Sequence, residues 1–85
     1  MATATPSPTP NPAAMKFDLD ITLPATLSFG SAADAADDPF AAAVFEGGGV
    51  ANLFGVASFV TVTREQGATW DDLVPRVVDA AADLL

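Results

Sequence analysis

The chain has 85 residues, 51% of them hydrophobic, and eleven carboxylates against three lysines and arginines give it a net charge of −8. This charge repels nucleic-acid phosphates and anionic lipid, so neither nucleic acid nor a membrane surface is an expected partner. The sequence contains no cysteine and no histidine, which excludes disulfides, thiolate metal ligands and most familiar catalytic sites. We therefore expect no enzymatic activity, no bound metal and no cofactor.

A chain of this length supports one domain with a modest core. No apolar run is long enough to span a membrane, and the N-terminus lacks a basic and apolar signal pattern, so we expect a cytoplasmic protein. Residues 1–8 are small and rich in proline, which predicts a flexible tail or a short edge strand ahead of a domain at residues 9–85. A strand at Ala2–Thr5 would suit a sheet edge, because Pro6 and Pro8 are two residues apart and both missing donors would face solvent.

Two strands are predicted next. Thr9–Pro12 forms a rigid turn, after which apolar and polar residues alternate strictly over Met15–Leu23, as in a half-buried strand. Pro24 interrupts the pattern, and Ala25–Phe29 alternates again. We expect this second strand to pair with the first as a hairpin.

A short helix is predicted after Asp38, which is a suitable N-cap, with Pro39 at the first helical position. Gly47–Gly49 supplies the left-handed backbone that ends a helix. These glycines follow a helix instead of preceding one, and no Lys–Ser/Thr pair comes after them. The sequence therefore predicts a helix exit here, not a phosphate-binding loop.

The C-terminal half predicts a second hairpin and a longer helix. Two β-rich runs, Val50–Phe54 and Phe59–Arg64, flank a short turn. Thr69 is the candidate N-cap of a helix whose apolar residues recur at helical spacing. Pro75 lies inside that pattern, so we expect a kink, or a first turn followed by a restart.

The predicted order β-β-α-β-β-α corresponds to a two-layer α+β fold. It consists of an antiparallel four-stranded sheet, or five strands if the N-terminal segment pairs, with two helices on one face. The residues expected to be buried together share the apolar layer between sheet and helices: Phe17, Leu19, Phe45, Val62, Trp70 and Val77.

Three blocks of sequence stand out by their order and spacing: Thr9–Pro12 with Lys16-Phe17; Pro39-Phe40 with Val44–Glu46 and Gly49-Val50; and Phe59–Arg64 with Trp70–Leu73 and Pro75. Together they resemble the N-terminal domain of the Nfu/NifU-type iron–sulfur cluster scaffold proteins. The resemblance covers nearly the whole chain from Thr9. One departure is Val56, which stands where the family usually has a glycine. We therefore expect the turn at Gly55–Ser58 to differ in geometry from the corresponding turn of the family.

The resemblance implies a non-enzymatic accessory module. In multidomain members of the family, this domain precedes a separate domain whose Cys-x-x-Cys motif holds the cluster. The present chain has no cysteine. We therefore expect a free-standing interaction domain that binds no cluster itself. The implied partners are a cluster-carrying scaffold domain or an iron–sulfur client protein.

Five residues are candidates for partner binding, and each has a simpler structural role as the alternative. Lys16 occupies a position that the family pattern specifies, but a strand lysine also pairs with nearby aspartates. Asn11 either presents its amide to a partner or holds an Asx-type turn. The last three form an acidic face of the C-terminal helix, which either meets a basic partner or simply solvates the helix: Asp71, Asp72 and Asp79.

Two other classes of function stay open. One is a small acidic enzyme or ligand-binding domain that uses carboxylates such as Asp18, Asp20 or Glu46, for which a deep pocket would be the distinguishing feature. The other is an oligomerisation unit without a role in cluster assembly.

Overall fold

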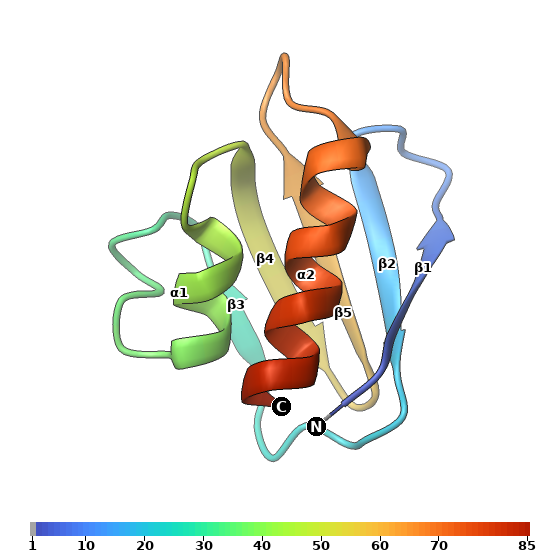
Figure 1. The fold of residues 1–85 in the computed structure, drawn as a ribbon, viewed down its shortest axis with the longest axis vertical. Helices are drawn as coiled ribbons and strands as arrows, with labels where there is room; N and C mark the ends of the chain where they lie inside the picture. The colour runs from blue at the N-terminus through green and yellow to red at the C-terminus, as the bar shows by residue number, and fades with distance from the viewer. Residues whose placement is uncertain (1) are drawn as a thin grey trace.

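The structure is a computed structural model that describes residues 2–85. A five-stranded antiparallel sheet is covered on one face by two helices, which Figure 1 shows in front of the sheet. The α+β class and the two-layer arrangement are as predicted. The elements in chain order are β1 (Ala4–Pro8), β2 (Ala14–Leu19), β3 (Leu27–Phe29), α1 (Pro39–Phe45), β4 (Val50–Val56), β5 (Phe59–Arg64) and α2 (Trp70–Leu84).

The strand order across the sheet is β1-β2-β5-β4-β3, and every pairing is antiparallel. The predicted hairpin between β2 and β3 is therefore wrong, because β3 pairs with β4 at the opposite edge. Strand β2 ends at Leu19, and the segment that follows runs alongside the β4–β5 turn. There the Leu19 N–H donates to the Ser58 carbonyl and the Leu23 N–H donates to the Ala57 carbonyl, both at 2.7 Å. These bonds direct the chain past β5 and β4 before it pairs again.

A fifth strand forms at the N-terminus, over Ala4–Pro8 and therefore later than the expected Ala2–Thr5. It contains both prolines, with Pro6 opposite Phe17 in the register. Backbone positions two apart point the same way, so both missing N–H groups face away from β2, as an edge strand allows. The Ala2 N–H also donates to the Ala81 carbonyl (3.2 Å), which holds the start of the chain beside the end of α2 (Figure 1).

The core lies between the sheet and the helices. Its largest fully buried side chains come from both layers: Phe17, Phe40, Leu53, Leu73, Val44, Val60, Val62 and Val77. Trp70 was predicted among the buried residues but is only half-buried. It stands at the first position of α2, where its indole N–H donates to the Pro12 carbonyl at 3.2 Å. That bond holds the ring at the edge of the core.

The two helices begin where the sequence predicts. The Asp38 carboxylate accepts the Ala41 N–H at 3.0 Å, so the predicted N-cap of α1 forms. Helix α2 continues from Trp70 through Pro75 to Leu84, and no restart occurs at the proline. Thr69 is the N-cap residue of α2, but its side chain makes no capping hydrogen bond. Among residues 2–85, neither helix is long and apolar enough to cross a bilayer.

Candidate functional site

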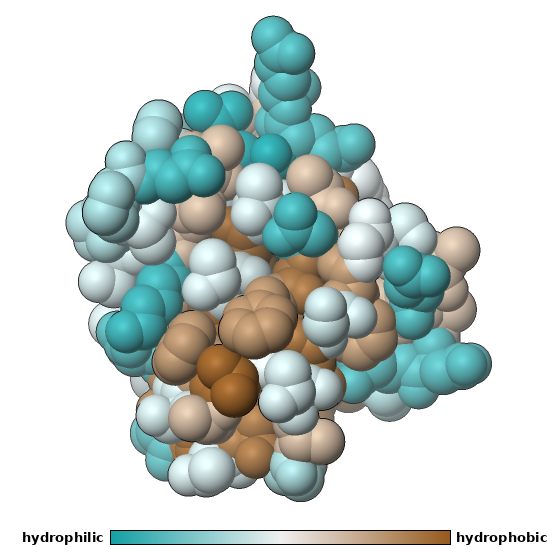
Figure 2. Space-filling model, turned by 180° about the vertical axis from the view of Figure 1, so that it is seen from behind, coloured by the Kyte–Doolittle hydropathy of each residue, from teal (hydrophilic) through white to brown (hydrophobic). Residues whose placement is uncertain are grey.

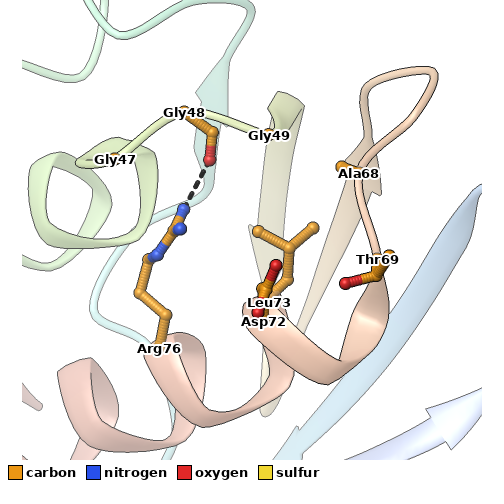
Figure 3. Close-up of a pocket in the computed structure, with 8 residues that line it drawn as sticks. All are labelled: Gly47, Gly48, Gly49, Ala68, Thr69, Asp72, Leu73 and Arg76. Carbon is orange, nitrogen blue, oxygen red and sulfur yellow. Dashed lines mark hydrogen bonds between the residues drawn. The ribbon is translucent and has the colours of Figure 1, made fainter.

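A cavity of about 140 Å³ lies between the exit of α1 and the start of α2 (Figure 3). Backbone of the three glycines forms one wall, and the first two turns of α2 form the other. The lining residues are Gly47, Gly48, Gly49, Ala68, Thr69, Asp72, Leu73 and Arg76. The cavity is too small for a drug-sized ligand, which needs roughly 300 Å³ or more.

Arg76 extends from α2 toward the glycine loop (Figure 3). One guanidinium nitrogen donates to the Val44 carbonyl at 3.1 Å and to the Gly48 carbonyl at 2.6 Å. These carbonyls lie at the C-terminal end of α1, where a cation is favourable and backbone acceptors lack helical partners. Gly47, Gly48 and Gly49 all have positive φ, and a Cβ at Gly47 would lie 3.2 Å from the guanidinium. The glycines therefore form the predicted helix exit, and Arg76 caps it.

The Thr9–Pro12 turn is closed by its own side chains. The side-chain amide oxygen of Asn11 accepts the Ala13 N–H at 2.9 Å, which forms the Asx-type turn, one of the two roles predicted for this residue. The Thr9 hydroxyl accepts the Asn11 N–H at 3.2 Å and lies 2.9 Å from the Ala14 carbonyl oxygen. Because Trp70 donates to Pro12, this turn lies against the first turn of α2.

Lys16 lies on the other face of the sheet, away from the helices. Its ammonium is 3.5 Å from an Asp18 carboxylate oxygen and 4.8 Å from the centre of the Phe59 ring. The predicted pairing with a strand aspartate is therefore confirmed. Both charged side chains are about half exposed, so this pair adds little to stability.

The three helix aspartates, Asp71, Asp72 and Asp79, are exposed on α2. The structure places Asn11 at the same end of the domain as Asp71, through the contact between the turn and Trp70. Asp79 lies about two helical turns further along. Lys16 is on the opposite layer, so the five candidates do not form one surface.

Sequence reasoning missed an apolar patch on the open face of the sheet. It consists of Phe54 and Val56 from β4 and Phe59 from β5, and we call it the outer patch. Val56 is directly opposite Phe59 in the register, and Phe54 is opposite Thr61. None of the three contacts the core, and Phe54 is 43% exposed. Figure 2 shows the hydrophobic surface gathered on this face, with hydrophilic side chains around it.

A signal for the outer patch was present in the sequence. In β4, apolar residues occupy both alternating sets of the sequence: Ala51 and Leu53 belong to one, and Val50, Phe54 and Val56 to the other. An antiparallel strand with one solvated face normally has polar residues in one set. In the part of the chain that the structure describes, no three histidine, cysteine or acidic side chains are grouped as a metal site would require.

Comparison with known proteins gives a consistent family relationship. Residues 5–85 match the family model described as "Scaffold protein Nfu/NifU N terminal". The crystal structure of protein SAV1430 from Staphylococcus aureus is 25% identical in sequence, with a TM-score of 0.78 over 92% of this chain and 96% of that chain. The solution structure of SeR13 from Staphylococcus epidermidis is 28% identical, with a TM-score of 0.63 over 93% of each chain. A search of curated proteins gave no match.

Proposed function

The chain belongs to the Nfu/NifU N-terminal domain family, and from that premise we propose that it is a non-enzymatic protein-interaction module of iron–sulfur cluster assembly. Its partner is a protein that carries the cluster, most simply a Cys-x-x-Cys domain of the same family, or a client that receives the cluster. The proposed location is the cytoplasm.

One observation carries the proposal: the family match extends over residues 5–85, which includes both helices and every strand apart from Ala4, the first residue of β1, but no cysteine or histidine. Thiolates hold most protein iron–sulfur clusters, so this chain's own side chains are a poor ligand set for one. A role in cluster assembly is then best served by contact with a protein that has those ligands.

The charge of the domain indicates the chemistry of that contact. Of the eleven carboxylates, only Asp18 lies within ion-pair distance of a lysine or arginine among residues 2–85. The other carboxylates make no ion pair among these residues, although Asp20, Asp38 and Glu65 each accept a backbone N–H. Together they attract lysines and arginines of a partner. Such attraction accelerates association and is screened by salt.

A titration of a fluorescently labelled Cys-x-x-Cys domain with this protein tests the proposal. Relatives that have both domains in one chain gain a high effective concentration, so the separated pair should bind weakly, with a Kd on the order of 0.1 mM. We expect binding at low ionic strength that weakens at least about tenfold between about 0.02 M and about 0.5 M salt. An uncharged crowding polymer at equal mass serves as the control for non-specific changes in fluorescence.

Absence of binding at millimolar concentration and low salt, with both the empty and the cluster-loaded partner, would contradict the proposal. If the protein then sedimented as a stable oligomer, the oligomerisation unit would become the better description. If binding occurred but did not change with salt, the proposed interaction would stand, and its electrostatic explanation would be wrong.

A further inference from the structure

The outer patch is larger than a single exposed side chain. Register places Phe54 beside Thr61 and Val56 beside Phe59, so the three apolar side chains occupy adjacent positions on β4 and β5. Nearby positions of the same face carry hydroxyl or amide groups: Ser28, Asn52, Thr61 and Thr63. An apolar centre with a polar rim is the usual composition of a protein-binding surface.

The fold does not need these residues to be apolar. The helices cover only the inner face. On the outer face the Lys16 ammonium lies over the Phe59 ring, 4.8 Å from its centre, while Phe54 is 43% exposed. A threonine at any of the three positions would keep the β propensity of the strand and reduce the exposed apolar area. A binding role gives a physical reason for the aromatic side chains, since desolvated aromatic residues are frequent hot spots of interfaces.

Charge indicates what kind of protein fits this surface. Asp18 lies directly opposite Phe59 in the register between β2 and β5, and exposed Asp20 follows two residues later. Each of the three lysine and arginine side chains already contacts the chain itself: Lys16 at Asp18 and over the Phe59 ring, Arg64 at the Ala68 carbonyl, and Arg76 at α1. A second copy would bring another net charge of −8 to the contact, which opposes association. A basic partner is attracted instead.

We infer that the outer patch is the docking surface for the partner, and that the partner presents an apolar group surrounded by lysines or arginines. The apolar group packs on Phe54 and Phe59. The basic residues face Asp18, whose ion pair with Lys16 is about half exposed, and Asp20, which also accepts the Thr3 N–H. This inference rests on the proposed function, because it names the surface through which that function would operate. The helix aspartates then act at longer range, by steering the approach of the partner.

Variants of the outer patch test this assignment in the titration with the Cys-x-x-Cys domain. Phe54→Thr should weaken binding about tenfold, because it removes an aromatic group from the centre of the contact. Val56→Thr is nearly isosteric and should weaken binding by a smaller factor, about threefold. Leu84→Thr is the matched control, since Leu84, at the end of α2, is the other large exposed apolar side chain among residues 2–85, with 46% of its surface exposed. It should bind as the wild type does.

The possible outcomes distinguish an error in the assigned docking surface from an error in the proposed function. If the wild type binds and both patch variants bind equally well, the surface assignment is wrong and the proposed function stands. If the wild type does not bind, the proposed function fails and the assignment fails with it. If sedimentation shows that the wild type self-associates and Phe54→Thr abolishes this, the occupant is a second copy, which contradicts the basic partner. The melting temperatures of Phe54→Thr and Val56→Thr should stay near that of the wild type. This control shows that any loss of binding does not result from loss of the fold.

Discussion

The two faces of the sheet use similar residue types for different purposes. On the inner face, Phe17 is opposite Val60 in the register, and both are fully buried beneath the helices. On the outer face, Phe59 is opposite Val56, and neither contacts the core. The inner pair stabilises the fold by removing apolar surface from water. The outer pair cannot do so to the same extent in the isolated domain, so its apolar character is better explained by a partner.

The largest expected effect comes from truncating a phenylalanine on each face. Phe17→Ala should destabilise the domain by about 3 to 5 kcal/mol, which approaches the whole stability of a small domain. Phe54→Ala should cost about 1 kcal/mol or less, because Phe54 is 43% exposed. Urea unfolding followed by Trp70 fluorescence measures both. Equal losses would show that the two faces do not differ as the structure indicates.

A matched pair of glycine substitutions examines the contact between the α1 exit and α2. A Cβ at Gly49 would lie 3.3 Å from both the Ala68 Cβ and a Leu73 methyl, whereas a Cβ at Gly48 would meet nothing within 4 Å. Both glycines have positive φ. Gly49→Ala should therefore destabilise by about 2 to 3 kcal/mol, and Gly48→Ala by about 1 kcal/mol. Thermal unfolding of the two variants compares them, and a larger loss for Gly48→Ala would contradict the packing described here.

A substitution in the β4–β5 turn should change stability by a smaller amount and should stabilise the domain instead of destabilising it. Ala57 has φ of +54°, the only positive φ of a non-glycine residue among residues 2–85. It is the first residue of a two-residue hairpin loop, where a type II′ turn normally has glycine. Ala57→Gly should stabilise by about 0.5 to 1 kcal/mol, while Ala25→Gly, at an exposed residue without positive φ, should destabilise slightly. A lower melting temperature for Ala57→Gly would refute this explanation.

The smallest expected effect concerns the cluster itself. Neither face carries a thiolate or imidazole, and carboxylates favour hard cations. Anaerobic reconstitution with iron and sulfide should leave the purified protein colourless, while a Cys-x-x-Cys domain treated in parallel should take up a cluster. A stoichiometric cluster that stays with this chain through gel filtration, without added thiol ligands, would show that the residues bind it in a way we have not described.

The sequence predicts the inner face much better than the outer face. Periods of two in the strands and of 3.6 in the helices identify core residues such as Phe17, Val62 and Val77 without knowledge of the pairing. The position of β3 could not be predicted in this way, because it depends on the hydrogen bonds of Leu19 and Leu23 to the β4–β5 turn. Consecutive strands pair more often than not, and that preference led to the wrong hairpin.

For the candidate binding residues, too, the sequence predicts the face of each element but not which elements lie side by side. The spacing of Asp71, Asp72 and Asp79 predicts a shared helix face, and the alternation over Met15–Leu23 places Lys16 on the side of its strand away from the core residues. Neither pattern shows which residues of other strands lie beside them. The outer patch exists only because β4 and β5 pair in a particular register, which aligns Val56 with Phe59. Trp70 is half-buried for a related reason, since its partner is Pro12, which is 58 residues away in the chain.

The most direct test of the central claim is a map of the contact by NMR. Uniformly ¹⁵N-labelled protein is titrated with the unlabelled Cys-x-x-Cys domain at low salt, and the shifted amides are assigned to residues. We expect the largest shifts on β4 and β5 around Phe54, Val56 and Phe59, and we expect these shifts to diminish as salt is added. Shifts confined to α2 and the glycine loop, or no shifts at millimolar partner, would contradict that claim.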